Sequence, residues 1–416
     1  MRRRAVLVAI LPFALLTSFD TASRAQLSDD ATPNSAPLVI PPKLPEPAGQ
    51  DEHLAPELTN EERRDAVRLL NELRGAARTA PDAADARLQL SEGLYRVGDF
   101  DAALDECQAA IKLEPGNARA HLHLGLILMA KQDSRAAATA LMETLLLDPT
   151  LPHAHYSLGN VQYALGNVKA ALLSYRKAIE LQPYFPDARY RLALLLKVTG
   201  REQEAAQFLE EAAIGGIPQA QFFLGNAYKN GQGVEKNLAH AVAWWAKATV
   251  FGHQPAADAL SKLRRQVLSA DQPERRRADA LDAFRRYRQG LWAEYPDLTP
   301  TEPDQSLGLT LVQRGDVENG VAALLAETSA LSEPALAELL RLYQQGIDVG
   351  LPVFDRRILS CFETTAADGF VPAKRALARI HARGLGVAPD SNKAKAALKG
   401  LAKQDAKALI DELGLR

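Results

Sequence analysis

The sequence predicts an all-α fold in which helical hairpins stack into a solenoid of two lobes. Leucine, alanine and proline each recur at a constant interval of 34 residues. The three series are Leu90, Leu124, Leu158 and Leu192; Ala103, Ala137, Ala171 and Ala205; and Pro81, Pro115, Pro149 and Pro183. This period is the length of one helix–turn–helix unit, which cannot bury its own apolar face and must stack on a neighbour. The composition agrees, because 47% hydrophobic residues with only 6% aromatic ones suit tightly stacked helices better than a β-sandwich core.

The N-terminus has the three regions of an export signal. Three arginines at 2–4 precede an apolar run at 5–16, and Ser23 and Ala25 are small residues before a cleavage point. A retained membrane anchor is the alternative, but the apolar run is shorter than the roughly 20 residues that span a bilayer. We therefore expect residues 1–25 to be a cleaved signal peptide and the mature chain to be periplasmic or secreted.

The next segment separates the signal from the repeats. Residues 26–56 carry many prolines among small polar residues, which predicts a disordered tether. The repeat array is expected over 57–217. Its first helix, over 61–79, is expected to cap the array and to begin with a capping box of Thr59 and Glu62.

One unit, residues 152–185, illustrates how each hairpin is expected to pack. Gly159 in the first helix lets the second helix approach closely, and Ala171 keeps the contact between them small. Gly166 permits a tight turn, and Pro183 stops the second helix.

These units resemble the tetratricopeptide repeat (TPR) family over residues 84–217. The resemblance is carried by Leu90-Ser91, Leu124-Gly125, Leu158-Gly159 and Leu192-Ala193, together with the alanine and proline series. It implies a right-handed α-solenoid that binds partners on its concave face.

Residues 218–268 look like a Sel1-like repeat, a slightly longer relative of the TPR hairpin. The similarity is carried by Leu224-Gly225, Gly231-x-Gly233 and Trp244-Trp245. The glycine pair would lengthen the turn, and the tryptophans would supply buried bulk.

The same spacing returns more faintly in residues 304–416, which predicts divergent TPR and Sel1-like repeats there. Leu377 and Gly384-x-Gly386 copy the Sel1-like pattern, and Leu307-Gly308 resembles half of a TPR. Between the two arrays, residues 269–303 break the period and predict a basic helix followed by a linker. We expect the two lobes to join there.

No motif for catalysis or for a cofactor is found. Gly231-x-Gly233 lacks the preceding strand, the third glycine and the lysine of a phosphate-binding loop. No serine lies in a glycine-flanked elbow, and neither Cys107 nor Cys361 has a local histidine partner. The cysteines are expected to be buried free thiols. We therefore predict no enzyme activity and no cofactor.

The formal net charge of −2 does not favour nucleic-acid binding. One local exception is the segment from Arg275 to Arg288, where six arginines could attract an anionic polymer. Its interspersed acids favour a solvated helix face instead.

Four of the eight histidines form two pairs, His121 with His123 and His153 with His155. Residues two apart on a helix point to different faces, so neither pair is a ready chelate, and no metal site is predicted. An alternative metal site would need His123 and His153 to meet across neighbouring repeats.

The TPR resemblance also implies which side chains line the concave face. The predicted groove residues are Glu92, Tyr95, Arg119, His123, Tyr156, Asn160, Tyr163, Tyr190, Arg191 and Lys197. Tyrosines offer apolar contact plus a hydroxyl, and an asparagine can bond a peptide backbone at both its donor and its acceptor. Asn160 with Arg191 resembles part of a carboxylate-clamping pattern, although Tyr156 stands where that pattern has lysine.

We predict a non-catalytic scaffold or adaptor that binds a protein or peptide partner in this groove. Exported proteins with both repeat types resemble periplasmic adaptors of the cell envelope, including those of exopolysaccharide export. A periplasmic metal- or small-ligand-binding protein is the alternative, and an enzyme with its site at the lobe junction is a third hypothesis.

Overall fold

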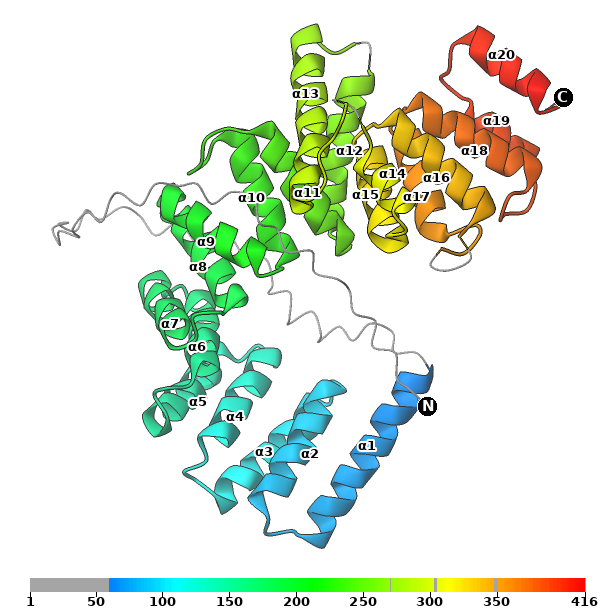
Figure 1. The fold of residues 1–416 in the computed structure, drawn as a ribbon. Coiled ribbons are helices and arrows are strands. Elements are labelled where there is room, and N and C mark those ends of the chain that lie inside the picture. Colours follow the sequence, from blue (N-terminus) through cyan, green and yellow to red (C-terminus); the bar gives the residue numbers. More distant parts are fainter. Residues whose placement is uncertain (1–59, 270, 303–304, 348–350, 416) are drawn as a thin grey trace. The chain divides into compact units, whose positions relative to one another are not determined.

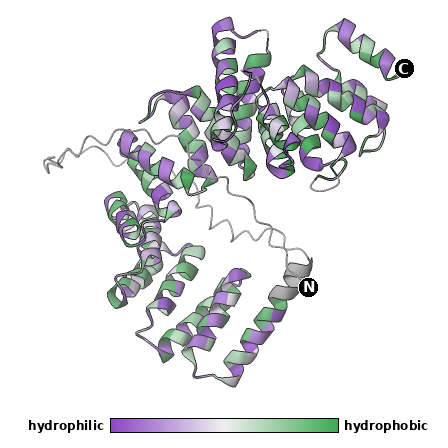
Figure 2. Ribbon diagram, viewed as in Figure 1, coloured by the Kyte–Doolittle hydropathy of each residue, from purple (hydrophilic) through white to green (hydrophobic). Residues whose placement is uncertain are grey.

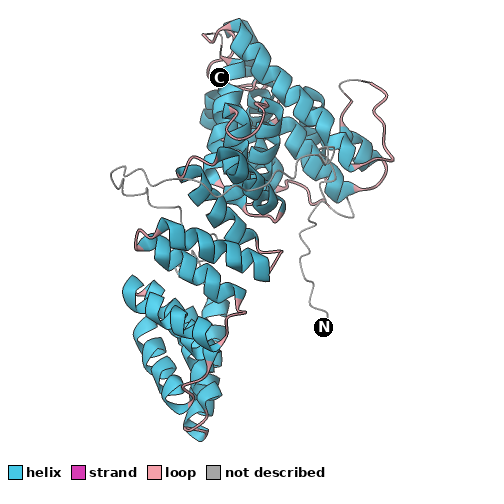
Figure 3. Ribbon diagram, turned by 90° about the vertical axis from the view of Figure 1, so that its left-hand side faces the viewer, coloured by secondary structure: helices cyan, strands magenta, loops and turns pink. Residues whose placement is uncertain are grey.

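The computed structural model describes residues 60–269, 271–302, 305–347 and 351–415. These residues form helices and loops, with one isolated bridge between Ile347 and Leu351 and no strand (Figure 3). The predicted all-α fold of stacked helical hairpins is confirmed. The predicted signal peptide, the Pro-rich tether and the Thr59 end of the capping box lie outside the described residues.

The chain divides into two compact units. The N-terminal unit comprises described residues 60–224 and 232–234, and the C-terminal unit comprises 225–231 and 235–415. The helices that begin in the N-terminal unit are α1 (Asn60–Thr79), α2 (Ala84–Arg96), α3 (Phe100–Leu113), α4 (Ala118–Ala130), α5 (Ser134–Leu147), α6 (Pro152–Ala164), α7 (Val168–Leu181), α8 (Pro186–Val198), α9 (Glu202–Ile214) and α10 (Pro218–Asn230). Figure 1 shows α2 to α9 as successive pairs of neighbouring helices.

Glycines set the close spacing of the two helices within a hairpin. A Cβ atom on Gly159 would lie 2.7 Å from the ring of Tyr175 in α7, and one on Gly125 would lie 2.7 Å from Leu141 in α5. No side chain fits at such a distance, so only glycine permits this packing. Hydrophobic and hydrophilic residues are interleaved along the helices (Figure 2), because each helix buries one stripe and exposes another.

The turn inside each hairpin from α2–α3 to α8–α9 uses a left-handed backbone conformation. The residues at this position are Gly98, Gln132, Gly166 and Gly200, with φ of 82°, 63°, 81° and 79°. A residue with a Cβ atom is disfavoured there, and glycine is not. Gln132 is therefore the strained member of the series.

Replacing Gln132 with glycine is expected to raise the free energy of unfolding by about 0.5–1 kcal/mol, since the backbone strain is removed. Urea unfolding followed by circular dichroism at 222 nm would measure the change. The reverse exchange, Gly166→Gln, should lower stability. A Gln132→Gly variant that is less stable than the natural chain would contradict this explanation.

The C-terminal unit continues the hairpin pattern with longer turns. Its helices are α11 (Leu238–Val250), α12 (Gln254–Leu268), α13 (Glu274–Leu291), the 3-10 helix η2 (Trp292–Glu294), α14 (Leu307–Gln313), α15 (Val317–Ser329), α16 (Glu333–Gln345), α17 (Arg356–Ala367), α18 (Val371–Arg383), α19 (Ser391–Ala397) and α20 (Lys403–Glu412). Trp244 and Trp245 of α11 are both buried, as the sequence predicts.

Three turns of this unit each contain an equivalent backbone hydrogen bond across the loop. The pairs are Asn237 N to Tyr228 O, Phe354 N to Tyr343 O and Asp390 N to His381 O, each at 2.9 Å. Asn237 and Asp390 then cap the next helix with a side-chain oxygen that accepts from two backbone N–H groups. The hairpins α10–α11, α16–α17 and α18–α19 are therefore built alike.

The predicted lobe junction at 269–303 is wrong. The division between the units lies near residues 225–235, and α13 packs on α11 and α12 inside the C-terminal unit. Arg288 of α13 also donates a hydrogen bond to the Ala330 carbonyl at 2.6 Å. The loss of the 34-residue period marked an inserted helix and not the end of a unit.

Candidate protein-binding face

One face of α6 carries three polar side chains. Tyr156, Asn160 and Tyr163 follow each other at helical spacing and so lie on the same side of the helix. The helix begins at Pro152. Proline is tolerated there because the first N–H groups of a helix have no acceptor within the helix. Tyr156 and Tyr163 are both half-buried.

Asn160 is fixed by the tyrosine beneath it. Its Oδ1 atom accepts a hydrogen bond of 2.7 Å from the hydroxyl of Tyr175 in α7. Its Nδ2 atom is buried and has no hydrogen-bond partner among the described residues. The structure therefore leaves the amide donors of Asn160 without a hydrogen-bond partner, while its acceptor is used.

Two residues of α8 complete this group from the neighbouring hairpin. Arg191 and Tyr190 have exposed fractions of 5% and 1%, and the Tyr190 hydroxyl has no hydrogen-bond partner among the described residues. Burial raises the pKa of the Tyr156 hydroxyl, while the charge of Arg191 acts in the opposite direction. Burial also raises the pKa of Tyr190 and Tyr175, so these hydroxyls stay protonated at neutral pH.

We call this group the tyrosine cluster. It consists of Tyr156, Asn160, Tyr163, Tyr175, Tyr190 and Arg191. Nearby, the Lys197 amine lies 5.6 Å from the centre of the Phe223 ring, a cation–π contact. The cluster is rich in hydrogen-bond donors and lies beside positive charge, so it is suited to an acceptor group such as a carbonyl or a carboxylate.

The other predicted groove residues are engaged with one another. Arg119 and Glu92 form a bidentate ion pair, with Nη2–Oε1 at 2.8 Å and Nη2–Oε2 at 3.0 Å. Tyr95 packs edge-on against His123, with ring centroids 5.4 Å apart. The predicted groove thus divides into a paired N-terminal part and the donor-rich part on α6 and α8.

Three of the predicted groove residues are less exposed than expected. His123, Tyr190 and Arg191 were expected at the open inner surface, but each is buried, with exposed fractions of 6%, 1% and 5%. Neighbouring hairpins cover them, since Tyr95 packs on His123 and Phe223 of α10 packs near Tyr190 with ring centroids 6.3 Å apart.

Burial should make His123 difficult to protonate. Desolvation lowers its pKa below the ordinary value of 6.5, while the charge of Glu92 partly opposes this shift. The stability that neutral His123 contributes is present above pH 6.5 and is lost as the pH falls through the lowered pKa. An NMR titration of the His123 ring, assigned with a His123→Gln variant, should give a midpoint below 6.5. A midpoint at or above 6.5 would contradict this prediction.

The histidine pair required by the alternative metal site does not come together. His123 of α4 packs on Tyr95, whereas His153 of α6 packs on Phe185 with ring centroids 5.0 Å apart. Within the part of the chain that the structure describes, no group of three or more His, Cys, Asp or Glu side chains is placed to hold a metal ion.

His121 and His155, the other members of the two histidine pairs, have a structural role that was not predicted from the sequence. Nε2 of His121 lies 3.0 Å from the Pro115 carbonyl oxygen, and Nε2 of His155 lies 3.0 Å from the Pro149 oxygen. In the first hairpin, Arg87 Nε donates to the Pro81 oxygen at the same distance. These residues recur at the 34-residue interval, so each polar side chain ties the loop between two repeats to the next helix.

Both cysteines are free thiols. Cys107 is buried as expected, but Cys361 is only partly buried. Burial raises the pKa of Cys107 to about 12 and that of Cys361 to about 11. Both therefore remain protonated at neutral pH and are poor nucleophiles.

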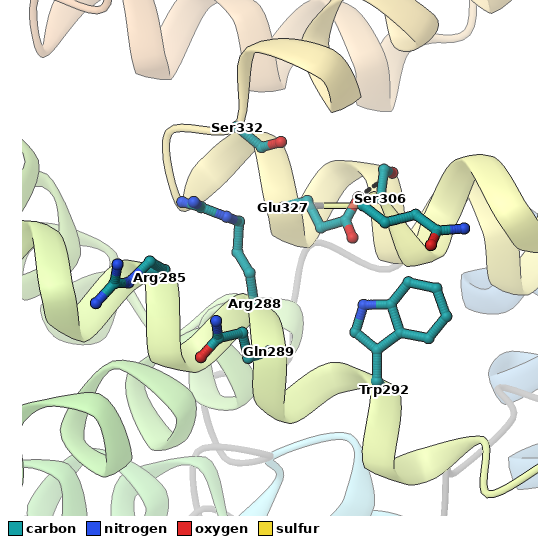
Figure 4. A pocket seen from close by; sticks show the side chains of 8 residues that line it. Arg285, Arg288, Gln289, Trp292, Ser306, Glu327 and Ser332 are labelled. Atoms are coloured by element: carbon teal, nitrogen blue, oxygen red, sulfur yellow. Dashed lines mark hydrogen bonds between the residues drawn. The ribbon is translucent and has the colours of Figure 1, made fainter. Parts of the chain in front are cut away.

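A small pocket lies in the C-terminal unit between α13, η2, α15 and the starts of α14 and α16 (Figure 4). Its lining residues are Arg285, Arg288, Gln289, Trp292, Gln305, Ser306, Glu327 and Ser332. Glu327 accepts hydrogen bonds from the Ser306 hydroxyl and from the Leu307 N–H at 2.7 Å, and so caps α14. The space enclosed is about 10 Å³, room for about one water molecule. A small-ligand site is not supported here.

The arginines of α13 are largely used within the protein. Asp282 pairs with Arg285 and with Arg286, each at 2.7 Å, and Arg277 donates to the Val267 carbonyl. This pairing does not support the alternative of an anionic-polymer site on α13. Among the described helices, none combines the length and apolar composition needed to cross a bilayer.

Family models match both predicted repeat types. Tetratricopeptide repeat models match residues 57–118, 88–155 and 152–185, and the Sel1 repeat model matches residues 218–249 and 371–396.

Curated relatives are similar over a short segment. The chain is 39% identical over 62 residues to DAP3-binding cell death enhancer 1 of Rattus norvegicus, which covers 15% of this chain and 12% of that protein. It is 41% identical over 63 residues to chitin synthase regulator SKT5 of Saccharomyces cerevisiae, covering 15% of this chain and 9% of that protein. The chain thus spans only a small part of the length of these relatives.

Solved structures of repeat proteins are also similar. A crystal structure of MamA is 27% identical, covers 40% of this chain and 96% of that chain, and has a TM-score of 0.35. YrrB, described as a TPR protein with an unusual peptide-binding site, is 22% identical, covers 45% and 96%, and has a TM-score of 0.36. A Sel1 repeat protein from Oxalobacter formigenes is 20% identical, covers 82% and 89%, and has a TM-score of 0.33.

Proposed function

Because residues 57–185 match tetratricopeptide repeat models and residues 218–249 and 371–396 match the Sel1 repeat model, we propose that the chain is a non-catalytic scaffold that binds an extended segment of a partner protein at the tyrosine cluster. Proteins made of these repeats are typically protein-interaction scaffolds, and stacked hairpins present a continuous surface to a partner. The segment would lie along α6 and α8, where the two helices supply side chains from neighbouring hairpins.

One observation supports this site above the rest of the surface. The Nδ2 group of Asn160 and the hydroxyl of Tyr190 are buried donors without partners among the described residues. Each such donor costs about 1–3 kcal/mol when it stays unsatisfied. A carbonyl or carboxylate oxygen of a partner segment would accept a hydrogen bond from Asn160 and recover part of that free energy, whereas Tyr190 is covered by Phe223 of α10. The half-buried rings of Tyr156 and Tyr163 would contact its side chains.

The location and the pathway are further parts of the proposal. The pattern of residues 1–25 supports export, and the partner would then belong to the cell envelope. The combination of TPR and Sel1 repeats supports one specific role, that of an adaptor of exopolysaccharide export machinery. Fractionation of cells that produce the full chain would test the location, and recovery only in the cytoplasm would overturn that part.

Capture of a partner tests the binding function. The tagged full chain, isolated from its own cells, should carry at least one specific partner identified by mass spectrometry. A Tyr163→Ala variant should lose it, while Leu173→Ala should retain it because Leu173 is exposed on α7 and lies outside the cluster. Equal capture by all three chains would overturn the proposed site.

A further inference from the structure

The last described helix of the C-terminal unit, α20, packs on the hairpin formed by α18 and α19 (Figure 1). Leu409 is the one buried side chain of α20, and it forms a small apolar cluster with Ala378 of α18 and with Leu398 at the end of α19. A helix of ten residues is too short to be stable on its own in water. The attachment of α20 therefore depends on this small apolar contact and on the charges around it.

Three arginines of α18 pair with the acids of α20. Arg375, Arg379 and Arg383 are four residues apart and so lie in one stripe along the helix. Arg375 Nη2 lies 3.1 Å from Asp405 Oδ2, whereas Arg379 and Arg383 share the Glu412 carboxylate, with N–O distances of 3.3 and 3.9 Å. All five side chains are exposed by 34% to 55%, so water and salt weaken these pairs. We call the three arginines the arginine stripe.

The acids of α20 neutralise the arginine stripe only in part. Three guanidinium groups share two carboxylates, and the buried Nε of Arg375 has no hydrogen-bond partner among the described residues. The hairpin itself, residues 371–399, carries seven Lys and Arg side chains against one acid, Asp390. Helix α20 brings two lysines together with its three acids. A helix with more acids and no lysine would therefore complement the hairpin better than α20 does.

We infer that α20 is a displaceable helix that covers a binding site for an acidic amphipathic helix of a partner protein. The partner's Asp and Glu side chains would pair with the arginine stripe, and its apolar stripe would replace Leu409 against Ala378 and Leu398. The occupant follows from α20 itself, which places one apolar and one acidic face on this surface.

Other occupants fit the surface less well. A second copy of this chain offers only another α20, which competes poorly with the tethered one because the tether gives the latter a high effective concentration. A nucleic acid or an anionic polysaccharide would leave the apolar side chains of Ala378 and Leu398 uncovered. The surface lies in the C-terminal unit and the tyrosine cluster in the N-terminal unit, so the inference does not rest on the proposed function.

Two synthetic peptides test this inference on the full chain. One is an amphipathic helix of Leu and Glu, and the other has Lys in place of every Glu. Fluorescence anisotropy should show binding of the Glu peptide and little binding of the Lys peptide. The variant Glu412→Lys should bind the Glu peptide about tenfold more tightly, because the arginine stripe then repels its own α20. Arg379→Glu should weaken binding by about tenfold or more.

Asp411→Lys is the matched control for Glu412→Lys. It makes the same charge change on the neighbouring residue of α20, which is exposed and lies outside the three ion pairs, so its affinity for the Glu peptide should equal that of the natural chain. Circular dichroism would verify that the exposed substitutions leave the fold intact. A Tyr163→Ala variant should also keep full affinity for the Glu peptide, which separates this surface from the tyrosine cluster.

Hydrogen exchange measures the displacement itself in the natural chain. When the Glu peptide is bound, the amides of α20 should exchange faster, because the helix is released, and those of α18 should not. No binding of the Glu peptide, equal binding of the Lys peptide, equal effects of Glu412→Lys and Asp411→Lys, or unchanged exchange in α20 would each overturn the inference. Stronger binding to phosphatidylglycerol vesicles than to the Glu peptide would also contradict it and would indicate a membrane surface.

Discussion

Replacing Asp368 with alanine is expected to lower the free energy of unfolding of the C-terminal unit by about 3–5 kcal/mol. The Asp368 carboxylate accepts hydrogen bonds from Arg264 Nε at 2.7 Å and Arg265 Nε at 2.9 Å, and also from the Ser261 hydroxyl. The side chains of Arg264 and Asp368 are exposed by only 4% and 2%. Removing the acid would leave the Arg264 charge buried without its counter-ion, which is far more costly than losing a surface pair.

Tryptophan fluorescence offers a selective measurement of this effect. All three tryptophans, Trp244, Trp245 and Trp292, lie in the C-terminal unit, so their emission reports the unfolding of that unit in urea. Arg265→Ala is the control, because its side chain is 68% exposed and its removal should cost less than about 1 kcal/mol. Equal destabilisation by the two variants would show that the buried pair is not what holds α12 to the end of α17.

An Asn160→Asp variant is expected to lose partner affinity by about 10- to 100-fold. The exchange keeps the shape of the side chain and the oxygen that accepts from Tyr175, but it replaces two amide donors with a carboxylate oxygen. The fold should be preserved, since Arg191 lies nearby and would tolerate the new charge. The partner's acceptor group would instead meet a second acceptor and be repelled.

Gln108→Glu is the matched control for this variant. Gln108 is exposed on α3, so the same amide-to-acid exchange adds one negative charge to the same unit away from the cluster. Its affinity for the captured partner should equal that of the natural chain. If Asn160→Asp bound the partner more tightly, the partner would be presenting a donor, and the interpretation of the cluster as an acceptor site would be wrong.

The sequence could predict those features that repeat at a fixed interval. Gly159 and Ala171 are placed as the spacing indicates, because packing inside a hairpin depends on residues close in the chain. The hairpin of α18 and α19 was also predicted, from the recurrence of the Sel1-like spacing at Leu377 and Gly384. Within the predicted groove, Tyr156, Asn160 and Tyr163 do share one face of α6.

Features that depend on a distant segment could not be predicted in this way. Arg264 and Asp368 are 104 residues apart and belong to no periodic pattern. The burial of Tyr190 depends on how α10 covers α8, and a repeat motif transferred position by position does not contain that information. The packing of α13 on α11 and α12 could not be predicted for the same reason, because an interrupted period does not reveal what the inserted helix packs against.

The central claim is that the face formed by α6 and α8 binds a partner segment. Site-specific photo-crosslinking would test this claim most directly. A photoreactive amino acid would replace Tyr163 in one chain and Leu173 in another, and irradiated cells would be analysed by mass spectrometry. We predict crosslinks from position 163 to one stretch of a single other protein, and none to that stretch from position 173. Crosslinks to the partner from position 173 alone would contradict the account.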